Sequence, residues 1–103
     1  MAVAELFRAL GDPTRLEIVR RLSTGAPYTI TTVSSGLDIS RQGARKHLQV
    51  LADAKLVTLE TQGRDTLVQL DREQLEQVKA FIAELERRWD MRLEKLRRFV
   101  EEE

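Results

Sequence analysis

The chain has 103 residues, of which 42% are hydrophobic and 33% are charged, and it contains no cysteine. This length predicts one domain, residues 1–103, and the lack of cysteine excludes a disulfide framework and thiolate chemistry. No apolar run is long enough to span a membrane, and Glu5 and Arg8 interrupt the first apolar stretch, unlike in a signal peptide, so we expect a cytoplasmic protein.

The basic and acidic side chains number seventeen each and cancel, but they are unevenly distributed. Residues 1–56 carry eight Lys or Arg against five acids, whereas residues 57–103 carry nine against twelve. A net charge of zero predicts weak non-specific attraction to nucleic acid, although it leaves room for specific binding. Most of the local basic excess lies on or beside residues 40–56.

The first two predicted helices are short and are separated at Gly11, which ends the first of them. The first helix has apolar residues at helical spacing, namely Val3, Leu6, Phe7 and Leu10. The second begins with Asp12 as N-cap and Pro13 at the first helical position, where a missing N–H costs nothing. Its predicted buried stripe consists of Leu16, Val19 and Leu22.

A loop, a short helix and a turn are predicted next. Residues 23–29 contain Gly25 and Pro27 and indicate a loop, after which Thr29 caps a short helix. Residues 37–39 form the turn, and Ser40 opens the following helix. Two helices joined by a tight turn, the second of them basic and amphipathic, are typical of a helix-turn-helix.

Residues 40–54 predict a fourth helix with two unlike faces. Its buried side consists of Ala44, His47, Leu48, Leu51 and Ala54. Its polar side carries Arg41, Gln42, Arg45, Lys46 and Gln49, with Ser40 as N-cap. Arg pairs bidentately with guanine and Gln with adenine, so this side suits the major groove of DNA. An ordinary amphipathic helix with a solvated basic face is the alternative, and the flanking segments favour DNA reading.

After residue 56 the apolar pattern changes from helical spacing to alternation. Val57, Leu59, Val68 and Leu70 alternate with polar residues, as in half-buried strands. Residues 61–65 supply the turn of a β-hairpin, with Gly63 at positive φ. A hairpin directly after a helix-turn-helix is a wing, and Arg64 at its tip either contacts DNA or is simply solvated.

From Asp71 the chain predicts one long helix, and we expect residues 71–100 to be a dimerisation helix. Its apolar side chains fall within an arc of roughly 80° and are Leu75, Val78, Ile82, Leu85, Trp89, Leu93, Leu96 and Val100. A helix of about 45 Å is too long to be covered by a domain with a radius of gyration near 13 Å. The simplest partner for the uncovered length is a second copy of the chain.

Two blocks of residues carry a family resemblance. The first runs from Phe7 to Ile18, and the second combines Ser40-Arg41-Gln42 with Lys46-His47-Leu48, Leu51 and Leu56-Val57. Over most of its length the chain resembles the ArsR/SmtB family of bacterial winged-helix repressors, which bind DNA as homodimers. The resemblance implies a mainly α winged helix-turn-helix with a small β-hairpin before the last helix. It also implies DNA contacts from Arg41, Gln42, Arg45 and Lys46, and an interface built from the first and last helices that includes Val3, Leu6 and Phe7.

The chain departs from its metal-sensing relatives at both of their metal sites. Residues 31–35 contain no cysteine where arsenic, cadmium and lead sensors carry them, and the last helix lacks the His of zinc, nickel and cobalt sensors. Selective binding of such metals needs Cys or His. We therefore expect no metal and no cofactor, as in the branch of the family without metal ligands.

Few other residues suggest chemistry. We expect His47, the single histidine, to be a hydrogen-bonded core residue and Trp89 to be a packing residue. Thr31 either holds a phosphate near a helix N-terminus or is a surface residue. Gly43 weakens its helix relative to Ala. It either lets the helix backbone approach DNA closely or is simply tolerated there. No activated nucleophile or Gly-rich phosphate loop is present, so we do not expect an enzyme.

These patterns together predict a sequence-specific DNA-binding regulator, a homodimeric repressor that reads an inverted repeat through residues 40–54. Two-fold symmetric proteins bind half-sites about one helical turn apart. Release from DNA is expected from an unidentified small-molecule effector between the long helices or from another protein, unless the circuit is autorepression alone. The alternative is a winged-helix module whose long helix binds a different protein and whose basic face is incidental.

Overall fold

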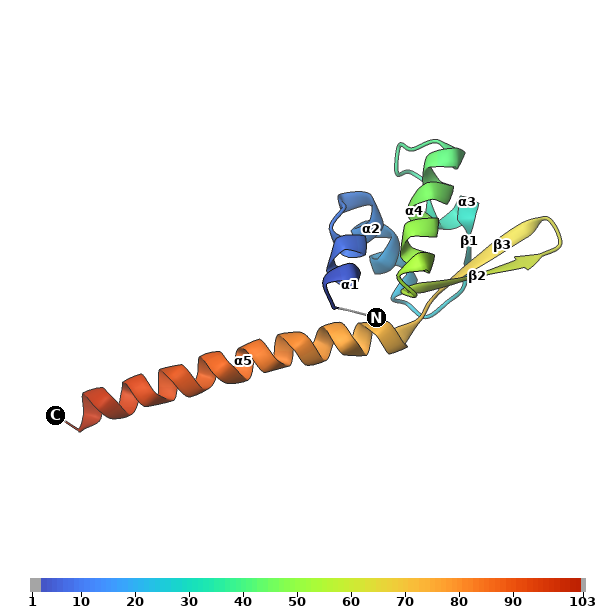
Figure 1. Ribbon diagram of the computed structural model, residues 1–103. Helices are drawn as coiled ribbons and strands as arrows, with labels where there is room; N and C mark the ends of the chain where they lie inside the picture. Colours follow the sequence, from blue (N-terminus) through green and yellow to red (C-terminus); the bar gives the residue numbers. More distant parts are fainter. Residues whose placement is uncertain (1–2, 103) are drawn as a thin grey trace.

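The computed structural model describes residues 3–102 and has a mainly helical body at one end of a long helix (Figure 1). The elements are α1 (Val3–Leu10), α2 (Pro13–Leu22), β1 (Tyr28–Thr29), α3 (Ile30–Val33), α4 (Arg41–Asp53), β2 (Val57–Gln62), β3 (Asp65–Leu70) and α5 (Arg72–Glu101). This order is that of a winged helix-turn-helix, and the predicted hairpin is present as β2 and β3.

A third strand extends the sheet beyond the predicted hairpin. β1 pairs antiparallel with β3, with Tyr28 opposite Val68, and the strand order is β1-β3-β2. We had predicted only a loop before α3. A strand of two residues whose partner is far along the chain leaves no local alternation to detect, so only the fold reveals it. The pairing ties the segment that enters α3 to the wing.

One apolar core joins α1, α2, α3, α4 and the base of the wing. Its largest fully buried side chains are Leu6, Ile18, Leu22, Leu48, Leu51, Leu56, Val33 and Val68. Two expectations are corrected here. Leu16 is 48% exposed, and Ile18 takes its place because the i, i+4 pair of Ile18 and Leu22 faces the core. Leu6, expected at an interface, is fully buried within its own protomer and has no surface left for a second copy.

The ends of the helices follow from local hydrogen bonds. The Asp12 side chain accepts from the backbone N–H groups of Thr14 and Arg15 at the start of α2, and the Asp71 side chain accepts from the backbone N–H of Glu73 at the start of α5. At the end of α4, Lys55 has a left-handed φ of 60°. The Leu56 N–H then bonds the Leu51 carbonyl, as in a Schellman cap, and places Leu56 in the core.

α5 extends well beyond the body of the protein (Figure 1). The radius of gyration is 18.7 Å, against about 13 Å for a compact chain of this length. α1 packs along the first half of α5, where the rings of Phe7 and Phe81 meet edge to face with centroids 5.7 Å apart. Further along, the apolar stripe is exposed, from 44% at Ile82 to 65% at Val100. Within residues 3–102 no helix has both the length and the apolarity to cross a membrane.

Candidate nucleic-acid interface

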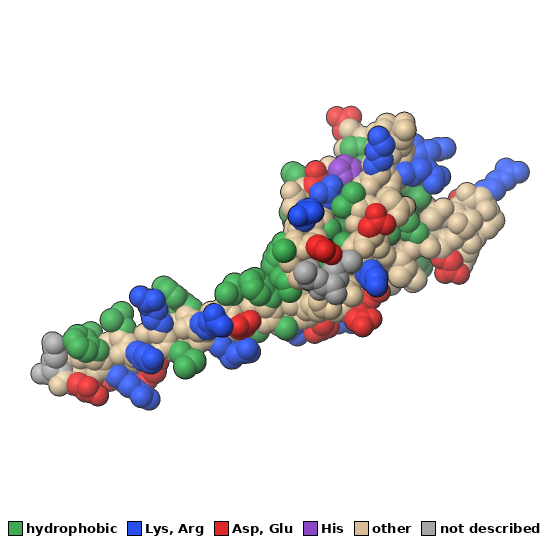
Figure 2. All heavy atoms as spheres, in the orientation of Figure 1, with side chains coloured by type: hydrophobic (Ala, Val, Ile, Leu, Met, Phe, Trp, Pro, Cys, Tyr) green, Lys and Arg blue, Asp and Glu red, His purple; other side chains and the backbone are tan. Residues whose placement is uncertain are grey.

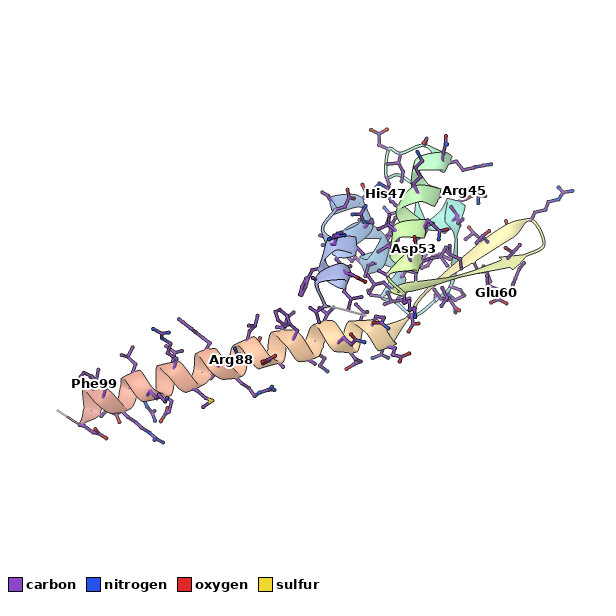
Figure 3. The ribbon with its side chains drawn as sticks, viewed as in Figure 1. Arg45, His47, Asp53, Glu60, Arg88 and Phe99 are labelled. Carbon is purple, nitrogen blue, oxygen red and sulfur yellow. The ribbon has the colours of Figure 1, made fainter. Side chains whose placement is uncertain are left out.

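α4 has the two unlike faces that the sequence predicts. Ala44, Leu48 and Leu51 are buried in the core. The polar side chains are all exposed, and they belong to Arg41, Gln42, Arg45, Lys46 and Gln49. Figure 3 shows Arg45 and His47 on different sides of α4. The buried face therefore fixes the helix on the body while five long polar side chains extend from it.

The first turn of α4 is closed by its cap. The Ser40 hydroxyl accepts from the backbone N–H of Gly43 at 2.9 Å. A Cβ on Gly43 would lie 3.2 Å from that hydroxyl oxygen, which is a tight contact. Glycine at this position thus leaves room for the cap, a local reason that the sequence did not reveal. The Ser40 oxygen uses one lone pair at the helix end, which leaves its hydroxyl proton and a second lone pair for another partner.

α3, α4 and the tip of the wing enclose a polar hollow of about 170 Å³. Its lining residues are Thr29, Ile30, Thr31, Arg41, Arg45, Arg64, Asp65 and Thr66. Four residues singled out in the sequence, three of them arginines, are brought together here from three elements. Among the ion pairs within residues 3–102, none involves these three guanidinium groups. The hollow is therefore suited to an anion such as a phosphate.

The wing ends in a turn of two residues, Gly63 and Arg64, rather than in the five-residue turn that we predicted. Gln62 pairs with Asp65, and Gly63 has φ 60°, which suits the first central position of a type II′ turn. Arg64 is consequently exposed at the tip. Figure 2 shows basic side chains gathered over α4 and at the end of the wing.

The other predicted site residues of α4 lie outside this hollow. Gln42 and Lys46 are exposed. Each follows one of the two arginines that line the hollow, so it lies about 100° further around the helix. The Gln49 side-chain amide donates to Asp53 at 2.8 Å. This bond uses one of the two N–H groups of the amide and holds the side chain along α4, so Gln49 starts less free than its neighbours.

Arg21 holds the helix-turn-helix in place, a role that we did not foresee. Its guanidinium donates to the carbonyls of Val33 at 3.0 Å and Ser35 at 2.7 Å, which ties the end of α3 to α2. From the sequence Arg21 is only an i, i+4 partner of Glu17, a pairing that is also present. Nothing local indicates that it reaches across to α3.

A second arginine joins α1, α2 and α4. Arg15 donates from Nε to the Ala9 carbonyl at 2.6 Å, and its Nη1 lies 3.2 Å from Nδ1 of His47. His47 is hydrogen-bonded as expected, but its side chain is 24% exposed, so it lies at the edge of the core. The Arg15 backbone N–H chiefly lowers the pKa of Asp12, helped by Thr14 and by the charges of His47 and Arg15, against a smaller effect of burial.

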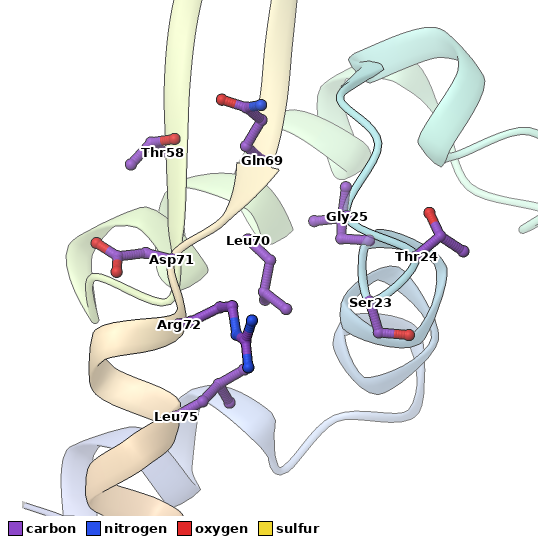
Figure 4. A pocket seen from close by; sticks show the side chains of 10 residues that line it. Ser23, Thr24, Gly25, Thr58, Gln69, Leu70, Asp71, Arg72 and Leu75 are labelled. Atoms are coloured by element: carbon purple, nitrogen blue, oxygen red, sulfur yellow. The ribbon is translucent and has the colours of Figure 1, made fainter.

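A larger hollow of about 720 Å³ lies where the wing meets α5 (Figure 4). Its lining comes from the end of α2 and the segment after it, from β2 and β3, and from the first turn of α5. The residues are Leu22, Ser23, Thr24, Gly25, Thr58, Gln69, Leu70, Asp71, Arg72 and Leu75. Elsewhere, no three His, Cys, Asp or Glu side chains within residues 3–102 lie close enough together to hold a metal ion.

The chain is similar to known regulators in both sequence and structure. Residues 10–60 match a family described as a helix-turn-helix domain. The chain is 31% identical to a cadmium resistance transcriptional regulatory protein CadC homolog from Staphylococcus aureus, over 84% of this chain and 73% of that protein. It is also 43% identical to the HTH-type transcriptional regulator YuzN of Bacillus subtilis (strain 168), over 57% of this chain and 71% of that protein.

Solved structures agree with these sequence relatives. The crystal structure of an ArsR family transcriptional regulator superimposes with a TM-score of 0.79 and 31% identity, covering 85% of this chain and 90% of that chain. An ArsR-like transcriptional regulator from Rhodococcus sp. RHA1 gives a TM-score of 0.75 at 29% identity, over 93% of this chain and 90% of that chain. The protein therefore belongs to the ArsR family of winged-helix transcriptional regulators and is a DNA-binding regulator.

Proposed function

We propose that the protein is a homodimeric repressor in which each copy inserts α4 into the major groove of one half of an inverted repeat. The observation that carries this proposal is the arrangement around the polar hollow. Arg41 and Arg45 extend from α4 toward the same space as Arg64 of the wing and Thr31 of α3. A base-reading helix and a backbone-binding edge side by side are what a groove-binding protein needs.

The residues divide between reading and positioning. Gln42 and Arg45 have the donor geometry for adenine and guanine edges, which carry sequence information. Thr31 and Arg64 lie at the rim, away from the axis of α4, and suit phosphate oxygens. Arg41 sits in the first turn of α4, where it serves either target. Since half or more of protein–DNA hydrogen bonds go to the backbone, this mixture is the usual one.

The homodimer is supported by the exposed half of α5. Leu85, Trp89, Leu93 and Leu96 are 45–61% exposed in a single copy, and a contiguous apolar face of this kind marks an interaction site. A two-fold dimer would also supply two copies of α4 for two half-sites. The expected small-molecule effector stays a prediction. The hollow of Figure 4 has a volume typical of small-ligand sites and touches both the wing and α5.

Replacing Arg45 by Ala tests the proposed function. The DNA site for this test is one selected from a random duplex library. We expect Arg45→Ala to weaken binding to that site by about 1–3 kcal/mol, and to relax preference at one base position. Fluorescence anisotropy on duplexes with single base changes measures both effects. Arg20→Ala is the matched control, because Arg20 is an exposed arginine of α2 outside the hollow.

Two results would count against the proposal. Equal losses for Arg45→Ala on the selected and a scrambled duplex would make Arg45 a backbone contact only. No salt-dependent retardation of any genomic fragment in gel shifts at two salt concentrations would favour the alternative, a module that binds another protein through α5.

A further inference from the structure

The hollow where the wing meets α5 has an apolar floor and a polar rim. Leu22, which is 1% exposed, lies at the floor, and Leu70 and Leu75 pack against the same core. Thr58 and Gln69, which are paired across β2 and β3, are exposed at the rim. The volume of about 720 Å³ falls in the range of about 300–1,000 Å³ that is usual for small-ligand sites. Size and lining therefore both suit a small molecule.

Arg72 supplies the single cation among the lining residues of this hollow. It takes part in none of the ion pairs found within residues 3–102. Figure 4 shows its guanidinium in the space between the first turn of α5 and the segment that follows α2. A guanidinium holds a carboxylate through two parallel N–H···O bonds and keeps its charge at any physiological pH. Arg72 is therefore placed to bind an anionic group inside the hollow.

Asp71, the single carboxylate among the lining residues, limits the charge of a ligand. It accepts from the backbone N–H of Glu73 at 3.0 Å, and in Figure 4 it points away from the guanidinium of Arg72. The lining therefore carries one charge of each sign. A dianion would meet one cation and one nearby carboxylate, whereas a monoanion is neutralised by Arg72 alone. The dipole of α5, whose N-terminus borders the hollow, also favours a negative charge there.

The polar groups on the α2 side of the hollow are already in use. The hydroxyls of Ser23 and Thr24 donate to carbonyls in the last turn of α2, so their protons are not free for a ligand. Recognition of a polar group then falls to Arg72 on α5, with the Thr58 hydroxyl and the Gln69 amide on the wing. The anion-binding part of the hollow is consequently its α5 side.

We propose that this hollow binds a small organic monoanion, a carboxylate on an apolar body, with the carboxylate on Arg72 and the apolar body over Leu22, Leu70 and Leu75. Burial of the apolar body supplies affinity, and the charge-assisted bonds to Arg72 select a carboxylate over a neutral analogue. The inference gives the expected effector a site within one copy of the chain and a chemical class. It rests on the proposed function only for the regulatory role of the ligand, because the site itself can be tested without DNA.

The walls of the hollow lead to the proposed DNA-binding surface. One wall is residues 23–25, and the chain continues from there to Thr29, which caps α3 and lines the polar hollow beside α4. The other wall includes Gln69 of β3, the strand in which Leu67 pairs with Thr29. A ligand held between these walls contacts both the segment that enters α3 and the wing. We therefore expect ligand and DNA each to change the affinity for the other, and such coupling is reciprocal.

Methyl NMR with octanoate as the probe tests the site in the absence of DNA. Octanoate should give saturable shifts at the methyl groups of Leu22 and Leu70. Octanol, which has the same length but no charge, should bind about tenfold more weakly. Shifts confined to Leu93 and Leu96 would place the probe on the exposed stripe of α5 and would overturn the proposal. Equal affinities for octanoate and octanol would overturn it as well.

Replacing Arg72 by Gln tests the role of the cation. Arg72→Gln should weaken octanoate binding about tenfold and leave octanol binding unchanged, because only the carboxylate loses its partner. Lys95→Gln is the matched control, since Lys95 is an exposed cation of α5 outside the hollow. Arg72 is exposed too, so the Tm of both variants by circular dichroism should equal that of the unchanged protein. Equal octanoate affinities of the two variants would contradict the assignment.

Fluorescence anisotropy on the selected duplex tests the effector role at constant ionic strength. Saturating octanoate should change the affinity for DNA by about fivefold or more, and Arg72→Gln should remove this effect at the same octanoate concentration. Octanoate that fills the hollow without changing the affinity for DNA would contradict the effector role.

The outcomes separate this inference from the proposed function. DNA binding without octanoate shifts at Leu22 or Leu70 would overturn the inference and leave the repressor intact. Octanoate binding in the hollow of a chain that retards no duplex would overturn the proposed function and leave the site intact.

Discussion

Asp12, the N-cap of α2, makes the stability of the fold depend on pH. Its carboxylate accepts two backbone N–H groups at the start of α2, and these bonds lower its pKa below the ordinary value of 3.8. A lowered folded-state pKa means that the contribution of Asp12 to stability is present above the unfolded-state value and is lost as the pH falls through the folded-state value.

Replacing this carboxyl group tests that linkage. Asn also caps helices but does not ionise, so Asp12→Asn should keep the fold and flatten the loss of stability between about pH 5 and pH 2. Tm measured against pH by circular dichroism checks this, with Asp38→Asn on the exposed turn as control. If Tm falls with decreasing pH as steeply in Asp12→Asn as in the unchanged protein, other carboxylates govern acid unfolding.

Residue roles that depend on one helix face were predictable, whereas roles that reach between elements were not. The exposure of Arg41, Arg45 and Lys46 follows from the 100° spacing of α4 alone. Arg15 and Arg21 look like ordinary surface arginines of a charged helix. Their hydrogen bonds to the carbonyls of Ala9 and Val33 exist only because the fold brings α1 and α3 within reach.

At the scale of elements, the backbone conformation at the end of α4 lowers the free energy of unfolding by a measurable amount. Lys55 adopts a left-handed φ of 60°, where a Cβ is unfavourable. We expect Lys55→Gly to raise the free energy of unfolding by about 0.5–1 kcal/mol, because glycine accepts this conformation without that cost.

Urea denaturation of Lys55→Gly measures the change. Lys55→Ala is the matched control, since it removes the charge but keeps the Cβ, and it should bring no comparable gain. An equal gain from both substitutions would trace the effect to the lost charge rather than to the backbone.

Most elements were predictable because their caps and spacings are local. Asp12-Pro13, Ser40 and Asp71 each mark a helix start that the structure has within a residue. The departures have tertiary causes. β1 forms only by pairing with β3, and α2 turns Ile18 rather than Leu16 to the core because the neighbouring helices decide which of two apolar arcs is covered.

At the scale of the whole molecule, the proposed dimer depends on the exposed stripe of α5. Trp89, the single tryptophan of the chain, is 61% exposed on a helix that the body covers only in its first half. If a second copy covers the stripe, tryptophan emission should shift to longer wavelength on dilution as dimers separate. Leu85→Asp should give the long-wavelength emission at every concentration, whereas the exposed Arg20→Asp of α2 should not.

The length of α5 and its apolar arc were readable from the sequence, but the covered edge was not. Phe7 contacts Phe81 because α1 folds back along the first half of α5. The polar hollow likewise needed the fold, since its residues come from segments separated by the turn and by the wing.

Selection of binding sites from a random duplex library tests the central claim most directly. Two copies that each read one half-site through α4 should enrich inverted repeats whose half-sites are centred about one helical turn apart, and Arg45→Ala should lose preference at one position of each half. Enrichment of a single half-site, or of no sequence above background, would contradict this.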